Sequence, residues 1–282
     1  MLELKDVCFT IRKDGEDANL VDKVSIQIPK GHFMAIVGPS GCGKTTLLKT
    51  IAGLNPESDG ALIWDGRDLS KEGDFSPTEI GYVPQFSIAY DPLTVDESVE
   101  AATRLRVKTQ NHAELDQRID RVLEETGLAP IADRPVKVLS GGQKRRLGLA
   151  MELVSDPKLL LCDEVTSGLD PRSEREIVRL LHDLSRKDGR IVLSVTHSLA
   201  HLELYDSILV TSRGPGRLPW PARPIDPLFL REGHGGGVST VGRSAVRSLA
   251  IVLGEAPRVL LQDARTQPRA FGGVRRPEPA PG

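Results

Sequence analysis

The sequence has no hydrophobic run long enough to cross a lipid bilayer, few aromatic residues and only three cysteines. A membrane-spanning helix needs about 20 consecutive apolar residues, so we expect none in this chain. The first six residues, Met-Leu-Glu-Leu-Lys-Asp, lack the basic and then apolar pattern of a signal peptide. We therefore expect a cytoplasmic protein.

The cysteines and the charges exclude further classes. Cys8, Cys42 and Cys162 form no Cys-x-x-Cys pair, which is typical of reduced thiols and not of a disulfide framework or a zinc site. The chain has 37 Lys and Arg against 39 Asp and Glu, a formal net charge of −2. Such a balance argues against binding of nucleic acid or an anionic membrane by the chain as a whole.

The last 69 residues differ in composition from the rest. Gly and Pro account for 21 of them but for only 26 of the first 213 residues, and the tail holds ten Arg and no Lys. A high content of Gly and Pro that follows no regular sequence repeat is typical of disordered segments. We expect a folded domain over 1–213 and a tail over 214–282 that is disordered or non-native. If the reading frame of the gene is shifted by one base over the codons for residues 225–237, it can encode a polar, helix-forming continuation of the folded domain. The alternative is that the tail is a natural disordered extension.

Short apolar runs alternate with amphipathic patterns in the first 213 residues. Residues 4–11 and 25–28 read as antiparallel strands, whereas 34–37, 159–162, 191–196 and 208–210 are typical of buried strands in a parallel sheet. Helical patterns dominate about 86–158, including a capping box that begins at Thr94. The sequence predicts an α/β fold with a mainly parallel sheet, an N-terminal antiparallel β subdomain and an inserted helical subdomain.

A phosphate-binding loop follows the apolar run at 34–37. Residues 38–45 match G-x-x-x-x-G-K-[ST] in full, after a strand pattern and before a helical one. In such a loop, backbone N–H groups and a helix N-terminus surround phosphate oxygens, the lysine reaches the β- and γ-phosphates, and the next hydroxyl binds Mg²⁺. The motif predicts nucleotide binding by Gly38, Pro39, Ser40, Gly41, Cys42, Gly43, Lys44, Thr45 and Thr46, with Thr45 on the metal.

Two adjacent carboxylates, Asp163 and Glu164, end the apolar run at 159–162. Alone, they could be exposed acids at the end of a core strand. Together with a phosphate loop they favour two neighbouring roles: Asp163 holds Mg²⁺, and Glu164 polarises the attacking water.

A second candidate phosphate-binding end lies at residues 139–143, Leu-Ser-Gly-Gly-Gln, before a helical pattern over 144–154. Ser140 could be an ordinary N-cap, but two consecutive glycines weaken a helix unless something must approach the backbone. The N–H groups at such a helix start can bind phosphate. If the two ends lie far apart, one nucleotide cannot use both ends of one chain, so we infer a second chain.

In their order, these motifs resemble the ATP-binding cassette (ABC) family. The others are Gln85 after Tyr-Val-Pro, Ser-Gly-Leu-Asp ending at Asp170, and His197 after the strand at 191–196. The resemblance covers 1–213 and implies hydrolysis of ATP to ADP and phosphate. It also implies that two cassettes pack head to tail, each ATP lying between one phosphate loop and the partner's signature motif. That motif corresponds here to Ser140, Gly141, Gly142 and Gln143.

The resemblance also implies roles for single residues. Gln85 would contact Mg²⁺ and the attacking water, Asp170 would cross the dimer interface besides capping a helix, and His197 would contact the γ-phosphate. The adenine position, usually aromatic in the family, corresponds to Ile11, with Phe9 on the same face of the strand. The implied catalytic set is Lys44, Gln85, Glu164 and His197, and the metal set is Thr45, Gln85 and Asp163.

We interpret the chain as the ATPase subunit of an ABC transporter. Its partners would be a second cassette, identical or paralogous, and a separate integral-membrane permease that places it on the inner face of the cell membrane.

The alternative is a soluble cassette ATPase acting on nucleic acid or ribosomes. The 96 residues between Lys44 and Ser140 leave no room for the long coiled coil of the DNA-repair members, so we expect no nucleic-acid partner. A non-hydrolysing regulatory cassette is a third class, which the intact motifs disfavour. Residues 163–170 and 193–197 look most like those of lipid or drug exporters.

Overall fold

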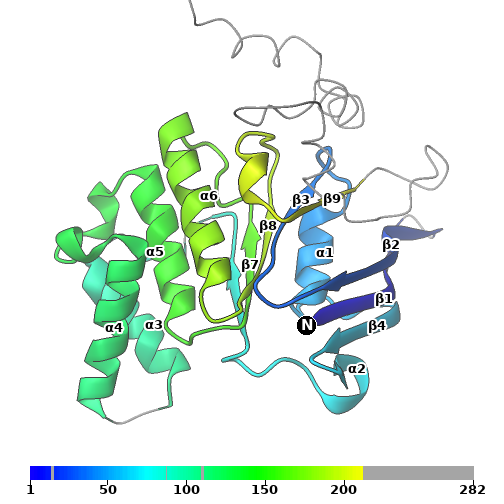
Figure 1. Ribbon diagram of the computed structural model, residues 1–282, viewed down its shortest axis with the longest axis horizontal. Helices are drawn as coiled ribbons and strands as arrows, with labels where there is room; N and C mark the ends of the chain where they lie inside the picture. The colour runs from blue at the N-terminus through cyan, green and yellow to red at the C-terminus, as the bar shows by residue number, and fades with distance from the viewer. Residues whose placement is uncertain (14–15, 87, 109–110, 212–282) are drawn as a thin grey trace, which may run out of the picture.

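The computed structural model describes residues 1–13, 16–86, 88–108 and 111–211 (Figure 1). The Gly/Pro/Arg-rich tail predicted over 214–282, with the hypothesis of a shifted reading frame, lies outside the described residues. The described part contains two sheets, with helices between and beside them.

The two sheets differ in strand direction. The four-stranded sheet is antiparallel, in the order β2 (Glu16–Ile28), β1 (Leu2–Lys13), β4 (Asp59–Trp64) and β5 (Arg67–Asp68). The five-stranded sheet is parallel, in the order β6 (Ile80–Val83), β7 (Leu159–Asp163), β8 (Ile191–Val195), β3 (Phe33–Val37) and β9 (Ser207–Val210). These sheets confirm the predicted α/β fold.

Apolar side chains on both faces explain why the parallel strands are buried. Every residue of β3, β7 and β8 is buried, as expected for a parallel sheet covered on both sides. Because side chains alternate between the two faces, Phe33, Ala35 and Val37 join one hydrophobic core, whereas Met34 and Ile36 join the other.

Six α-helices complete the described part. They are α1 (Lys44–Ile51), α2 (Leu69–Glu72), α3 (Val95–Arg106), α4 (His112–Thr126), α5 (Gly141–Leu153) and α6 (Pro171–Arg186). Three short 3₁₀ turns occur at Ala129–Ile131, Val136–Val138 and Leu202–Leu204. Helix α1 contacts strands of both sheets and lies between them (Figure 1).

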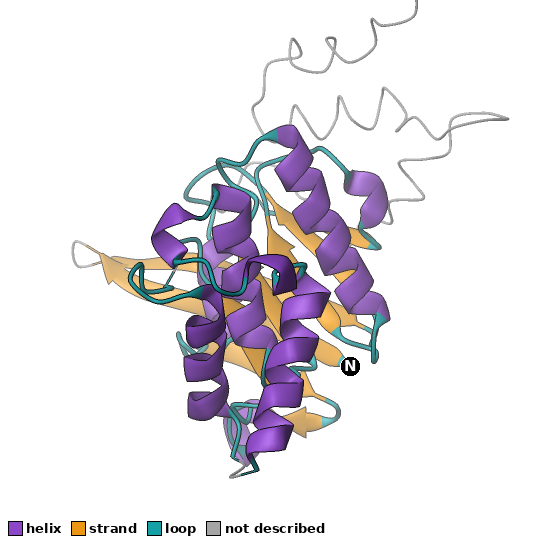
Figure 2. Ribbon diagram, turned by 90° about the vertical axis from the view of Figure 1, so that its left-hand side faces the viewer, coloured by secondary structure: helices purple, strands orange, loops and turns teal. Residues whose placement is uncertain are grey.

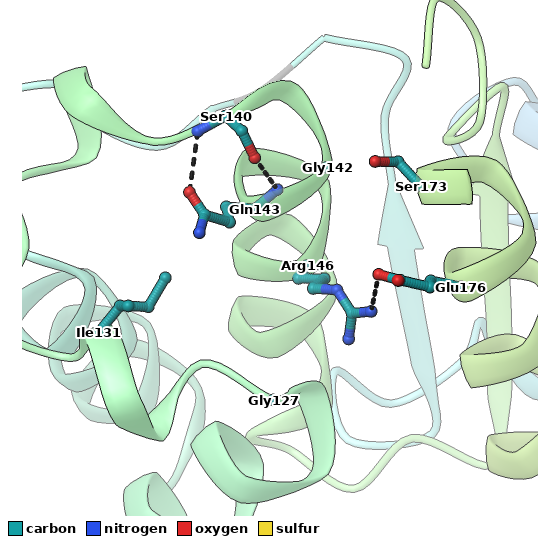
Figure 3. A pocket seen from close by; sticks show the side chains of 8 residues that line it. All are labelled: Gly127, Ile131, Ser140, Gly142, Gln143, Arg146, Ser173 and Glu176. Carbon is teal, nitrogen blue, oxygen red and sulfur yellow. Dashed lines mark hydrogen bonds and ion pairs between the residues drawn. The ribbon is translucent and has the colours of Figure 1, made fainter. Parts of the chain in front are cut away.

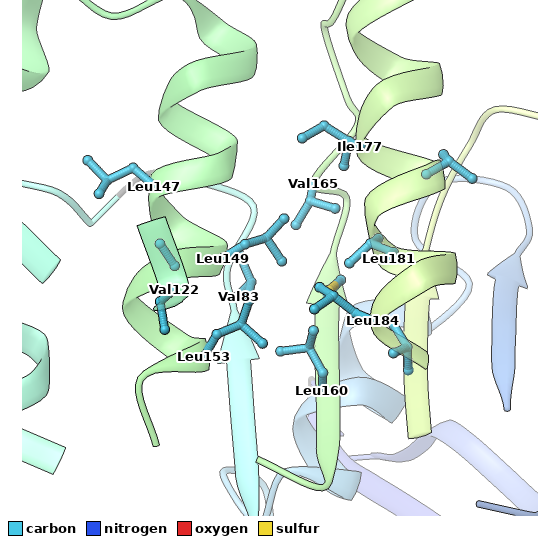
Figure 4. Close-up of a cluster of buried hydrophobic side chains, with 14 of the residues drawn as sticks. Val83, Val122, Leu147, Leu149, Leu153, Leu160, Val165, Ile177, Leu181 and Leu184 are labelled. Carbon is cyan, nitrogen blue, oxygen red and sulfur yellow. The ribbon is translucent and has the colours of Figure 1, made fainter. Parts of the chain in front are cut away.

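Helices α5 and α6 cover the opposite face of the parallel sheet, and α3 and α4 pack beside α5 (Figure 1 and Figure 2). Leucines of α5 and α6 point toward Val83 of β6 and Leu160 of β7 in the shared core (Figure 4). The capping box at Thr94 is present: its hydroxyl accepts the Glu97 N–H at 3.1 Å, and its own N–H donates to the Glu97 carboxylate at 2.8 Å. None of the described helices is both long and apolar enough to cross a membrane.

The structure differs from the sequence prediction at several elements. Helix α5 begins at Gly141, directly after Ser140, and so includes two glycines and a glutamine that we placed before the helix. Strand β2 is longer than the predicted segment 25–28, and β4, β5 and β6 had no prediction.

Candidate nucleotide site

The predicted site residues gather at one edge of the parallel sheet, where its strands end. Such an edge is where open α/β sheets bind ligands, because loops from several strands converge there. The phosphate loop follows β3. Three other strands place predicted side chains at the same edge: Gln85 after β6, Asp163 and Glu164 at the end of β7, and His197 after β8.

Close backbone contacts explain two glycines of the phosphate loop. Gly43 has a φ of +91°, and a Cβ there would come within 2.1 Å of the Leu20 carbonyl oxygen on β2. A Cβ on Gly38 would come within 2.4 Å of the carbonyl oxygen of Thr211. A side chain at either position would displace neighbouring backbone, so the loop can close only with glycine.

Lys44 lies across this loop. The side chain is buried, and its ammonium group donates to the carbonyl oxygens of Gly38 at 2.8 Å and Pro39 at 3.1 Å. Helix α1 begins at the same residue, and Gly43 before it has no side chain with which to cap the first-turn N–H groups. A buried cation next to the N-terminus of a helix forms a site of positive potential that suits phosphate.

The carboxylate of Asp163 accepts a hydrogen bond at each of its oxygens. Thr45 Oγ1 donates to Oδ1 at 2.9 Å, and Tyr82 Oη donates to Oδ2 at 3.2 Å. Burial raises the pKa of the Tyr82 phenol, and the negative charge of Asp163 raises it further, so the hydroxyl keeps its proton and donates. Thr45 and Asp163 therefore lie together, and hydroxyl and carboxylate oxygens are ligands that fit Mg²⁺.

Glu164 is held by two of the other predicted catalytic side chains. Gln85 Nε2 donates to Glu164 Oε2 at 2.9 Å, and His197 Nε2 lies 2.8 Å from Oε1. The backbone of Glu164 has a φ of +51°, a left-handed conformation that residues with a Cβ seldom adopt. Strain of this kind often occurs at functional positions.

One neighbour of this group was not predicted from the sequence. Arg145, on α5, donates from its guanidinium to the main-chain carbonyl of Gln85. Burial lowers the pKa of Arg145, and the nearby Glu164 carboxylate opposes that shift. No local pattern identifies this contact, because 60 residues separate the two partners.

Ser140 caps the other candidate phosphate-binding end. Its hydroxyl accepts the Gln143 N–H at 3.3 Å, and its own N–H donates to Gln143 Oε1 at 2.9 Å, a complete capping box. Both residues line a hollow of about 340 Å³. Figure 3 shows Ser173 and Glu176 of α6 on the other side of it. A Cβ on Gly142 would lie 3.3 Å from Ser173 Oγ, so packing between α5 and α6 also favours this glycine.

The two candidate phosphate-binding ends belong to helices on opposite faces of the parallel sheet. The apolar residues of α1 join the core that faces the antiparallel sheet, whereas those of α5 join the core on the other face (Figure 1). The structure therefore does not bring Ser140–Gln143 together with the phosphate loop of the same chain.

The remaining predicted residues lie at the margins. Asp170 is exposed and caps α6: its carboxylate accepts the N–H groups of Arg172 at 3.1 Å and Ser173 at 3.0 Å. Hydrogen bonds from Ser173 lower the pKa of this carboxyl. Ile11 is half-buried on β1 opposite Ala18, whereas Phe9 packs against the core between the sheets.

A phosphate loop after one parallel strand and a carboxylate pair at the end of another strand of the same sheet define the class of P-loop nucleoside triphosphatases. A family profile described as "ABC transporter" matches residues 21–167. The chain belongs to this family, as the order of its motifs predicted.

Three similar proteins support that assignment. The ABC transporter ATP-binding/permease protein Rv1747 of Mycobacterium tuberculosis is 38% identical over 214 residues, which are 76% of this chain and 24% of that protein. The methionine import ATP-binding protein MetN of Haemophilus influenzae is 33% identical over 219 residues, 76% of this chain and 63% of that protein. This chain thus spans less than two thirds of either relative. The dimeric structure of the ATP-binding cassette MJ0796 bound to ADP and Pi matches with a TM-score of 0.65 at 28% identity, over 75% of this chain and 94% of that chain.

Proposed function

We propose that this chain is the ATP-binding and ATP-hydrolysing subunit of an ABC transporter. The observation that carries the proposal is the position of Glu164, which lies between Gln85 and His197 and next to the Thr45–Asp163 pair. A carboxylate held at both oxygens beside a phosphate loop is placed to accept a proton from a water that attacks the terminal phosphate.

Each side chain of the site has a defined task in this proposal. Lys44 and the N–H groups of the phosphate loop bind the phosphates; Thr45 and Asp163, with Gln85, would hold Mg²⁺, which neutralises charge on the phosphates when bound. Glu164 takes the proton of the attacking water, Gln85 orients that water, and His197 contacts the γ-phosphate. Ile11 lies where the adenine ring would pack.

We also propose that two chains complete each site. The signature residues Ser140–Gln143 begin a helix on the opposite face of the sheet from α1, and a second cassette would bring its own copy of them to the phosphate loop, with Asp170 at the contact. The related cassette MJ0796 is described as dimeric, which supports the arrangement. The cassette would span 1–213, with the helical insertion at about 86–158 and the tail outside it.

A membrane permease is the proposed second partner. Three apolar side chains follow Gln85 and are largely exposed: Phe86 at 75%, Ile88 at 60% and Tyr90 at 67%. Neighbouring exposed apolar residues often form a docking surface, and here they continue directly from the site. The permease would hold the chain on the inner face of the membrane and select the cargo. That the chain serves an exporter, as residues 163–170 and 193–197 suggest, remains a prediction.

Complementation between two inactive variants tests the two-chain site. Lys44→Ala should weaken nucleotide binding, because it removes the positive charge that would contact the β- and γ-phosphates. Ser140→Arg should block the signature end. A mixed dimer has one doubly damaged site and one intact site, so mixing the variants should restore part of the ATPase activity. Lys49→Ala, at the other end of α1, is the control and should bind ATP normally. Full-rate hydrolysis by a permanent monomer would refute the two-chain site.

A further inference from the structure

A line of hydrogen bonds crosses the protein from the helical insertion to the phosphate loop. At its outer end, Arg106 of α3 contacts Glu152 Oε1 of α5 at 2.5 Å. The other oxygen of Glu152 accepts the main-chain N–H of Tyr82 at 3.0 Å. The Tyr82 hydroxyl then donates to Asp163, which also accepts from Thr45. Tyr82 therefore joins two buried carboxylates through two different groups.

The two carboxylates of this line, Glu152 and Asp163, are buried, so their hydrogen bonds replace contacts with water. The exposed fractions of Glu152 and Asp163 are 2% and 3%. A carboxylate so far from water is costly unless hydrogen bonds compensate it, and each of these four oxygens has a partner. Because strand β6 and Glu152 fix the backbone of Tyr82, its ring and hydroxyl have a defined position next to Asp163.

We infer that Tyr82 is a positioning residue for Mg²⁺ binding: its hydroxyl holds Asp163 in the orientation that the metal requires. Thr45 and Tyr82 bind different oxygens of the same carboxylate, so together they fix the plane of the group, which one hydrogen bond alone would leave free to rotate. Outer partners of this kind orient metal-binding groups, and their loss typically weakens metal binding by about 10–100-fold. The inference rests on the proposed function, since it concerns the metal of that site.

The variant Tyr82→Phe tests the inference, because it removes one oxygen atom and keeps the ring. The background is Glu164→Gln, which blocks hydrolysis, and the readout is the ATP-induced rise in melting temperature at increasing free Mg²⁺. We expect the half-saturating Mg²⁺ concentration to rise by about 10–100-fold. The affinity for ATP in EDTA should not change, because the phosphate loop does not involve Tyr82.

Tyr205→Phe is the matched control. Tyr205 is also buried, and its ring stacks on Phe33 with centroids 4.1 Å apart, in the core on the helical side of the sheet. This variant loses the same atom at a position whose hydroxyl interacts with Ser194 and not with Asp163, so its half-saturating Mg²⁺ should equal that of the parent. An equal shift in both variants would mean that a general loss of stability is responsible, and would overturn the inference.

Two other outcomes would separate this inference from the proposed function. If the parent protein shows no Mg²⁺ dependence of nucleotide binding, both the proposed metal site and the role of Tyr82 fail. If the parent depends on Mg²⁺ and Tyr82→Phe matches it, or binds Mg²⁺ more tightly, only the positioning role fails.

Discussion

The substitution Glu164→Gln separates catalysis from binding, because it removes a proton acceptor and preserves the shape of the side chain. In the structure, one oxygen of Glu164 accepts from Gln85 and the other lies 2.8 Å from His197 Nε2. A glutamine can keep the first contact through its oxygen. Its amide group can donate to His197, since an imidazole nitrogen accepts in one tautomer. The arrangement of the three side chains should therefore survive.

The expected effects on activity and on stability differ in size. Loss of a general base lowers turnover by about 10²–10⁴-fold, which is about 2.7–5.4 kcal/mol of activation free energy. The free energy of unfolding should change by no more than about 1 kcal/mol, because one charge-assisted hydrogen bond becomes a neutral one. The kinetic effect thus exceeds anything that a loss of folded protein could produce.

Phosphate release at saturating ATP measures turnover, and calorimetric titration of ATP measures binding. We expect slow release, unchanged affinity and, in gel filtration with ATP, a shift from monomer to dimer. The dimer should disappear when Ser140→Arg is added. Glu100→Gln is the control: it is a carboxylate on α3, paired with Arg104, and its variant should turn over normally. Near-normal hydrolysis by Glu164→Gln would refute the assignment of the base.

Three further predictions concern other parts of the site and its support. A bulky maleimide on Cys42 should inactivate the protein, and bound ATP should protect the thiol from labelling. The reason is that the thiol lies in the phosphate loop, 2.9 Å from Thr211 Oγ1. Equal labelling with and without ATP in a mass spectrum would contradict this prediction. Burial raises the pKa of Glu152 above its ordinary value of 4.5, although Arg106 opposes the shift. The folded state thus retains a proton that the unfolded chain releases, so this group lowers stability as pH rises from about 4.5 through its folded pKa. Urea unfolding of Glu152→Gln should lack that decline, and its stability relative to the parent should increase with pH; a constant difference would refute the shift. At position 164 both Ala and Gly lose the carboxylate, but Gly should unfold at a higher urea concentration than Ala, since it adopts a positive φ at no steric cost; the reverse order would show that the backbone is not strained.

Much of the fold could be predicted because the parallel strands are short and apolar on both faces. Each of β3, β7 and β8 is bounded by polar or turn residues, so its pattern is distinct. Strand β6 was missed because it has only four residues and includes Gly81, where a Cβ would lie 3.1 Å from the ring of Pro157. That packing depends on a segment far along the chain and leaves no local signal.

The start of α5 shows a different limit. Two glycines and a polar residue have low helix propensity, so the sequence favours a start at 144. The capping box of Ser140 and Gln143 compensates for that cost and extends the helix by a turn. The pattern S-x-x-Q was available as a signal, but we set the N-cap interpretation of Ser140 aside in favour of a binding motif.

The residues of the site divide in the same way. Motifs located Thr45, Gln85, Asp163, Glu164 and His197, because each follows a recognisable strand or loop, and the structure brings these five together. Arg145 lies in no motif, and Tyr82 stands in the Tyr-Val-Pro-Gln stretch with no role assigned from the sequence, because both act through contacts across the tertiary structure. Glu152 did leave a signal: it is a charged residue within an otherwise mostly apolar stretch of helix, which indicates a buried partner.

The left-handed backbone at Glu164 has a consequence for engineering this protein. A campaign that selects variants only for heat tolerance would sample residues that relieve the strain at this position, glycine and asparagine above all. Such variants would keep the fold and lose the carboxylate. Thermostability screens of this chain therefore need an activity filter, because a substitution that relieves the strain at this position removes the carboxylate on which the proposed reaction depends.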